Sequence, residues 1–154
     1  MKIRNVHKRM IHADPELVAR ELATLGQPND TLYPPRWQPM TLDRPLGVGA
    51  TGTHGTIIAY EYGKLIRFRF PSGTGVCGTH AFTVDDAGQG WLRVGHEVVA
   101  EAGLATWLVW KAVIEPAHDT VLEQLLDRLQ AAVDRLPANP VVPSVYARLL
   151  RRFD

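Results

Sequence analysis

The stretch GLATWLVWKAVIEPAHDTVLEQLLDRL, residues 103–129, decides the fold. After Gly103, apolar side chains recur at three- and four-residue steps with one seven-residue gap: Trp107, Trp110, Ile114, Val121, Leu125 and Leu129. This spacing indicates one amphipathic helix that continues to about Leu136. Pro116 is expected to kink it, because proline removes one hydrogen bond and clashes with the carbonyl of Ala112. A competing interpretation makes residues 106–114 a strand, since Thr, Trp, Val and Ile favour sheets.

Upstream of this helix, short alternating segments separated by turn residues predict antiparallel strands. The turn signals are Gly63, Pro71-Ser72-Gly73 and the loop Asp85–Gly88. A first helix opens at Asp14-Pro15-Glu16, where Asp14 can cap, and stops at Gly26. The expected strands are residues 3–12, 36–42, 51–62, 64–70, 76–84 and 91–100. Strands collected between two helical segments indicate an α+β fold with a six- or seven-stranded sheet.

Composition fits one globular domain and argues against several classes of function. The chain has 154 residues, of which 45% are hydrophobic and 21% charged. A formal net charge of +1 predicts no nucleic-acid partner. Cys77 is the only cysteine, so neither an internal disulfide nor a cysteine-based zinc site can form. The apolar stretches are too short for stable membrane insertion, and a reducing cytoplasm is the expected location.

The order of elements resembles the START-like, or SRPBCC, helix-grip superfamily, in particular its polyketide cyclase/dehydrase and lipid-transport branch. Three stretches carry the resemblance: the helix opening at residues 13–18, the Trp-containing segment 36–40 followed by the glycine-rich residues 47–52, and the amphipathic helix ending at 122–129. It covers residues 1–136. The resemblance implies a curved sheet wrapped around the C-terminal helix with a cavity between them. It does not imply one activity.

Strand alternation divides the side chains between two faces of the expected sheet. Charged residues, among them Arg67, Arg69 and Arg93, gather on one face, which we expect to be solvated. The opposite face is apolar and aromatic, and glycines within the strands favour curvature that leaves room under the helix. The residues expected to bind a ligand there are Ile58, Tyr60, Phe68, Phe70, His80, Phe82, His96, Val98, Trp107, Trp110 and Ile114.

Two histidines stand out among these inward residues. If the turn lies at Asp86–Gly88, His80 falls nearly opposite His96. Facing imidazoles in an apolar setting resist double protonation, and can serve as a polar anchor or as a general acid/base. They can equally be a core pair that satisfies its own hydrogen bonds. His54 is expected more than about 10 Å away along its strand, so no metal or cofactor is predicted. His118 can reach the cavity from the helix or can simply cap an apolar edge.

Three functions remain open on the sequence. The first is binding or carriage of a small hydrophobic or aromatic molecule. The second is a cyclase or dehydratase in which His80 and His96 transfer protons. The third is a protein-interaction domain without a small ligand. The inner face carries no carboxylate and no Ser or Cys nucleophile beside a histidine, which favours binding over covalent chemistry.

Residues 137–154 are predicted to form a linker and a short terminal amphipathic helix capped by Ser144. Val145, Leu149 and Phe153 fall at four-residue steps on its expected apolar face. A helix of this length is marginal alone and must dock to be stable. It can pack on its own domain, cover the cavity mouth or contact a second subunit in a homodimer.

Overall fold

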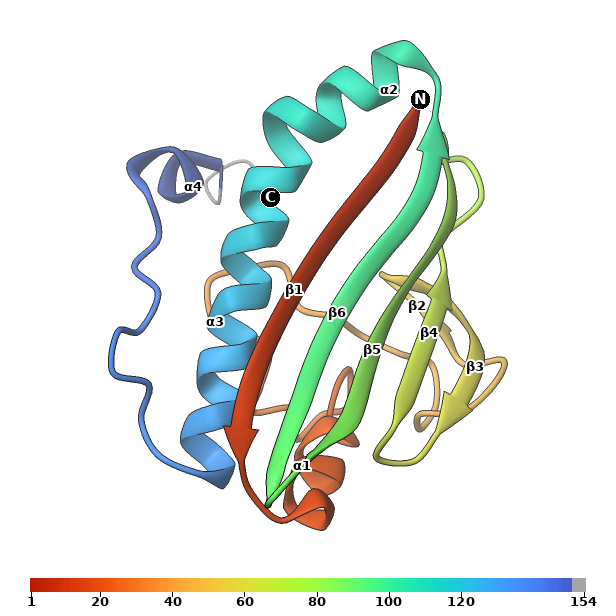
Figure 1. Ribbon diagram of the computed structural model, residues 1–154. Coiled ribbons are helices and arrows are strands. Elements are labelled where there is room, and N and C mark those ends of the chain that lie inside the picture. The colour runs from red at the N-terminus through yellow and green to blue at the C-terminus, as the bar shows by residue number, and fades with distance from the viewer. Residues whose placement is uncertain (151–154) are drawn as a thin grey trace.

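A six-stranded antiparallel sheet curves around a long helix in the computed structural model, which describes residues 1–150 (Figure 1). The α+β helix-grip prediction is therefore confirmed. The elements follow in the order β1 (Lys2–His12), α1 (Pro15–Leu22), β2 (Thr51–Gly52), β3 (Gly55–Glu61), β4 (Leu65–Arg69), β5 (Val76–Gly88), β6 (Trp91–Ala102), α2 (Leu104–Val109), a π-helical turn (Trp110–Ile114), α3 (Glu115–Val133) and α4 (Val145–Leu150).

The first and last strands of the chain lie side by side, because the sheet order is β1-β6-β5-β4-β3-β2. Lys2 pairs with Glu101 and His12 with Trp91, so β1 follows β6 along its whole length. The β5–β6 hairpin turns at Gln89-Gly90, slightly later than expected. Figure 1 shows α3 running beside β1, which brings residues at opposite ends of the sequence together.

Two of the expected strands are organised differently. Residues 36–42 form no strand, and only Leu42 makes an isolated bridge, to Gly52. The expected strand 51–62 is instead a tight hairpin, β2 and β3, that turns at Thr53 and His54. Glycine permits both corners of this turn: a Cβ on Gly52 would lie 1.7 Å from the Thr41 carbonyl oxygen. Gly55 has φ +110° and would place a Cβ 2.0 Å from the Arg69 oxygen.

The long C-terminal helix spans 30 residues, and the interpretation of residues 106–114 as a strand is wrong. Its axis changes direction between α2 and α3 (Figure 1). A π-turn lies just before Pro116, in which the Glu115 N–H donates to the Trp110 carbonyl. Pro116 has no N–H for the carbonyl of Ala112. The Tyr146 hydroxyl donates to that oxygen instead.

The main core lies between the sheet, α1 and the second half of α3. Phe68 is fully buried there against the α3 leucines, and Phe82 is 5% exposed. Both phenylalanines therefore point inward, as the alternation predicts. Arg67, Arg69 and Arg93 are exposed on the opposite face. A separate apolar cluster near the start of the chain contains Ile3, Val98 and Trp110, with Phe70 and Trp107 packed against it.

The terminal segment docks on its own domain, but through a different face from the one expected. Ser144 caps α4 as predicted, since its Oγ accepts from the Ala147 N–H at 3.0 Å. Ala147 is 1% exposed, whereas Val145 and Leu149 face solvent. Phe153 lies outside the described residues. Within residues 1–150, no helix combines the length and the apolar character needed to cross a membrane.

Candidate functional site

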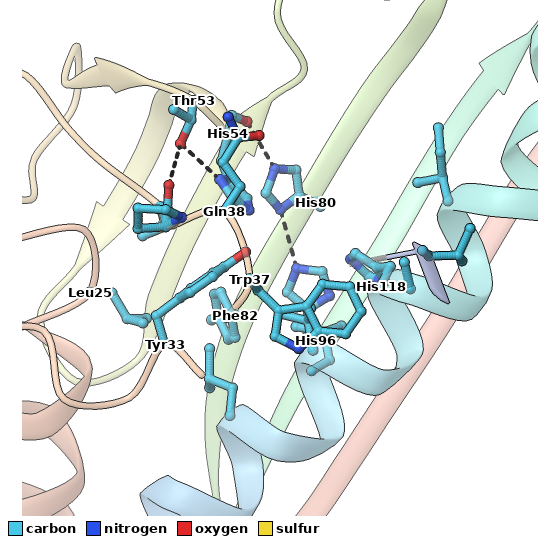
Figure 2. A pocket seen from close by; sticks show the side chains of 18 of the residues that line it. Leu25, Tyr33, Trp37, Gln38, Thr53, His54, His80, Phe82, His96 and His118 are labelled. Atoms are coloured by element: carbon cyan, nitrogen blue, oxygen red, sulfur yellow. Dashed lines mark hydrogen bonds between the residues drawn. The ribbon is translucent and has the colours of Figure 1, made fainter. Parts of the chain in front are cut away.

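A cavity of about 380 Å³ lies between the inner face of the sheet, the β2–β3 turn, the segment after α1 and the long helix (Figure 2). Its apolar wall combines side chains from the long helix, β5, the α1–β2 segment and α4: Leu25, Tyr33, Trp37, Pro39, Met40, Phe82, Val113, Ile114, Ala117, Val121, Leu122, Leu125 and Leu150. Its polar lining is Gln38, Thr53, His54, His80, His96 and His118. No side chain in this described lining carries a carboxylate, an ammonium or a guanidinium group.

Four of the residues expected to bind a ligand line this cavity: His80, Phe82, His96 and Ile114. The other expected residues lie elsewhere in the described structure: Ile58, Tyr60, Phe68, Phe70, Val98, Trp107 and Trp110. Phe68 fills the main core, and Val98 and Trp110 belong to the second cluster. At Ile58 the β3–β4 register shifts, so the fully buried neighbour is Ile57. The cavity thus lies nearer the β2–β3 turn than the alternation alone indicates.

His80 and His96 form the predicted contact. Their side chains are 4% and 2% exposed, and His80 Nδ1 lies 3.2 Å from His96 Nε2 (Figure 2). The strands pair His80 with Val98 and Phe82 with His96, so the two imidazoles meet diagonally rather than directly opposite. His80 also stacks on Phe68, with ring centroids 4.9 Å apart. The pair is held firmly by β5, β6 and the core beneath them.

The partners of this pair fix its tautomers. A carbonyl oxygen only accepts, so His80 Nε2 donates to the His54 carbonyl at 3.1 Å. In a neutral His80, Nδ1 then carries a lone pair, and His96 Nε2 must donate to it. His96 Nδ1 is consequently also a lone pair. It is buried and has no hydrogen-bond partner among residues 1–150.

His54 lies much closer to the pair than expected. We expected His54 more than about 10 Å away along a continuous strand, but the ring centroids of His54 and His80 are 6.1 Å apart. The reason is the hairpin at Thr53-His54, which folds His54 back over the cavity. The Thr53 hydroxyl lies 3.2 Å from His54 Nδ1 and holds the ring (Figure 2). The Gly52-Thr53-His54-Gly55 pattern was the signal for this turn in the sequence.

His118 extends the pair into a row, rather than simply capping an apolar edge. Its ring centroid is 5.1 Å from that of His96 (Figure 2). On its other side, the ring centroid of His7 is 6.2 Å away. His7, on β1, was not singled out in the sequence. We call His54, His80, His96, His118 and His7, in that order, the histidine row. It runs from the β2–β3 turn across the cavity wall to the contact of β1 with α3.

Acidic residues of α3 surround the His7 end of the histidine row. His7 Nδ1 lies 2.7 Å from Glu123 Oε1, and His7 Nε2 lies 3.0 Å from Asp119 Oδ1. Arg9 continues this strip, with hydrogen bonds to Glu123 and Asp127. The signal in the sequence was the four-residue spacing of the three acidic residues on one helix face, opposite alternating polar residues of β1.

Burial keeps the cavity end of the histidine row uncharged. Desolvation, and then the nearby His80, lowers the pKa of His54 to about 4. Desolvation lowers the pKa of His80 as well, against the opposing effect of its bond to the His54 carbonyl. Desolvation and the neighbouring imidazoles hold the pKa of His96 well below its usual value and lower that of His118 to about 3. Near neutral pH these four side chains are therefore hydrogen-bonding groups without charge.

No family model matches the chain, and no curated protein matches it either. Solved structures do. A Thermobifida fusca protein solved by NMR superposes with a TM-score of 0.62 at 12% identity, over 88% of this chain and 98% of that one. Truncated norcoclaurine synthase from Thalictrum flavum gives 0.64 at 13%, over 84% and 92%. The chain has an SRPBCC-like fold. At these identities the likeness shows the fold alone.

Another solved structure that superposes on the chain is norcoclaurine synthase from Thalictrum flavum in complex with dopamine and hydroxybenzaldehyde. It superposes with a TM-score of 0.64 at 13% identity, over 85% of this chain and 86% of that one. The chain described here shares the curved sheet and long helix of that enzyme.

Proposed function

We propose that this protein binds a small, uncharged, largely apolar molecule in the cavity between the sheet and the long helix. The observation that carries the proposal is the combination of an apolar wall with neutral imidazoles held in place by β5, β6 and the β2–β3 turn. A volume of about 380 Å³ lies at the lower end of the range of roughly 300–1,000 Å³ found for ligand pockets. Burying a charged ligand here would be costly, because no opposite charge lines the wall.

The chemistry of the wall also defines what the ligand should carry. Aromatic and branched side chains favour a ring or a compact hydrocarbon, and the polar lining can orient a hydroxyl or carbonyl group. The aromatic ligands named for the norcoclaurine synthase complex are consistent with such a molecule in a cavity of this fold. That likeness supports the class of ligand and not its identity.

Native mass spectrometry of freshly purified full-length protein is the direct test, since a co-purified molecule would reveal its chemical class. Displacement of a hydrophobic fluorescent probe provides the quantitative measurement. Ala117→Trp fills the cavity from α3, whereas Ala132→Trp adds the same side chain on an exposed part of that helix. We expect the first variant to lose at least tenfold in probe affinity and the second to bind normally. Equal binding by both variants would contradict the proposed site.

A cyclase or dehydratase is the second candidate, favoured by the bond between His80 and His96. An unprotonated imidazole in a cavity wall is a proton acceptor, so the pair could serve as a general base for a bound substrate. The test is incubation with the molecule that co-purifies. An enzyme would convert it, and His80→Gln would retain binding while losing conversion. If no small molecule binds at all, the third candidate, a protein-interaction domain, becomes the stronger one.

The segment 137–154 is proposed to cover the cavity mouth of the 1–136 domain. Leu150 of α4 lines the cavity, and Ala147 is buried beside Trp37 and Val121. Truncation after Pro137 should therefore raise the rate of probe release while the protein stays folded. Unchanged release and unchanged oligomeric state would show that the segment neither covers the cavity nor joins a homodimer.

A further inference from the structure

The histidine row ends in a second group of potential ligands, which shares His118 with the cavity lining. His7, His118 and Asp119 each offer one donor atom, and these three atoms all lie within 4.8 Å of one another. His7 belongs to β1, while His118 and Asp119 are neighbours near the start of α3. All three side chains are partly buried. The group therefore joins β1, the first strand of the chain, to α3.

We propose that His7, His118 and Asp119 form a binding site for a divalent transition-metal ion such as Zn²⁺. Two imidazoles and one carboxylate suit such ions, whereas Mg²⁺ and Ca²⁺ prefer sites made of oxygen ligands. In a tetrahedral zinc site, bonds of about 2.0–2.1 Å place the donor atoms roughly 3.4 Å apart. His7 Nε2 and Asp119 Oδ1 are 3.0 Å apart, close to that spacing.

The surroundings of His7 are those that a metal-binding imidazole needs. Histidines that bind a metal through one nitrogen usually donate the other N–H to a carboxylate, which fixes the tautomer. His7 Nδ1 contacts Glu123 at 2.7 Å, which leaves Nε2 for the metal. Arg9 in turn holds Glu123 at 2.9 Å, and Asn5 donates to Asp119 at 2.7 Å. Glu123 thus orients His7 from the nitrogen that faces away from the site, and Asn5 holds the Asp119 oxygen that faces His7.

The present hydrogen bonds of His7 also fit a metal. His7 Nε2 faces Asp119 Oδ1 at 3.0 Å, while Nδ1 faces Glu123 Oε1 at 2.7 Å. A divalent ion bound between Nε2 and Oδ1 would offset the two carboxylate charges. His118 Nδ1, meanwhile, is buried and has no hydrogen-bond partner within residues 1–150. Buried polar atoms without partners carry a free-energy cost, and an ion bound at this nitrogen would remove it.

The test uses the full-length protein, freed of any affinity tag and treated with a chelator. Zn²⁺ binding is measured by titration calorimetry, and Co²⁺ binding by its visible absorption. We expect one ion per chain. His118→Gln and Asp119→Asn should each weaken Zn²⁺ binding by at least tenfold, and Glu123→Gln by about 10–100-fold as a lost outer partner. His12→Gln is the matched control, because His12 is exposed and packs against Trp91 away from the site.

Two results would overturn the proposal: no Zn²⁺ binding by the wild-type chain, or Zn²⁺ binding that is as strong in the His118 and Asp119 variants as in the wild type. Circular dichroism shows whether each variant folds. If the variants at the site do not fold, NMR of the wild-type protein decides, since paramagnetic Co²⁺ should broaden the imidazole signals of His7 and His118 and leave His12 unchanged. The proposal does not depend on a cavity ligand, because the metal alone is the probe.

Discussion

The two halves of the long helix meet the same sheet in different ways. From Leu122 onward, α3 packs its leucines into an apolar core with Phe68 and with α1, and only Leu122 and Leu125 of these described leucines also border the cavity. Before Val121 the helix contains a π-turn, a proline and His118, and it borders the cavity and the histidine row. The same helix therefore stabilises the fold at its C-terminal end and leaves room for a cavity and its histidines at its N-terminal end.

The largest effect on stability should come from the packed half of the helix, which is the part of α3 from Leu122 onward. Leu126→Ala removes a side chain that is fully buried, and we expect a loss of about 3 kcal/mol in the free energy of unfolding, within the usual 2–5 kcal/mol. Ile114→Ala changes a cavity-lining residue of the other half that is 37% exposed, and should cost less than about 1 kcal/mol. Urea denaturation measures both. Equal losses would mean that the two halves are packed alike.

The sequence accounts for most of the packed half, although Phe68, which was expected to line the cavity, fills the core instead. Leucines at helical spacing and alternating strand residues each bury one face, so their partners follow from periodicity. His80 and His96 followed from the same alternation. Of these predictions, the helix, the sheet and the histidine contact are confirmed; the part played by the cavity residues in binding stays a prediction.

The open half, where the helix before Val121 faces the cavity and the histidine row, could not be predicted from periodicity. Its geometry depends on irregular features of the backbone. The β2–β3 turn brings His54 over the cavity, and the bulge at Ile58 exchanges that residue with Ile57. A slip of one residue reverses which side chains face inward. His7 and His118 meet only because β1 lies next to α3, a contact between distant segments that no local pattern reveals.

The β2–β3 turn, which positions His54, provides a second test of the difference between the two halves. Gly55→Ala would place a Cβ 2.0 Å from the Arg69 oxygen at φ +110°, so the backbone must move. We expect a loss of at least about 2 kcal/mol, more than the roughly 1–2 kcal/mol of unfavourable φ alone. Gly49→Ala is the control: its φ is +91° and no described atom lies within 4 Å of the added Cβ. Similar losses in thermal denaturation would show that the turn tolerates movement.

Acid should destabilise the open half through His54. Its folded pKa, about 4, is below the ordinary value of 6.5, so the folded state stays neutral while the unfolded state binds a proton. Stability from this group is therefore complete above pH 6.5 and is lost as pH falls toward 4. The free energy of unfolding should fall by about 1.4 kcal/mol per pH unit in this range, or by roughly 2 kcal/mol between pH 7 and 5.

His54→Gln isolates this contribution, because the His54 carbonyl that accepts from His80 is part of the backbone and remains. Unfolding free energies measured from pH 7 to pH 5 should fall less steeply in the variant than in the wild type. Parallel curves would mean that His54 is protonated as easily in the folded state as in the unfolded chain.

The smallest effect concerns the bond between α4 and the π-turn. Tyr146→Phe removes a hydrogen bond to the Ala112 carbonyl, worth about 0.5–1.5 kcal/mol. The Tyr146 side chain is 46% exposed, so the lower end of that range is expected. Six helical residues are unstable alone, so amide exchange over 145–150 should quicken while global unfolding changes little. Leu149→Ala, on the exposed side of α4, is the control.

The cause of this bond can be tested separately. The Ala112 oxygen is available to Tyr146 because Pro116 brings no N–H to it. Pro116→Ala restores that donor, so Tyr146→Phe should cost less in the Pro116→Ala background than in the wild type. A double-mutant cycle, read from amide exchange of α4, measures this coupling. Strictly additive effects of the two substitutions would show that the docking of α4 does not depend on Pro116. The π-turn would then shape the cavity and have no part in docking α4.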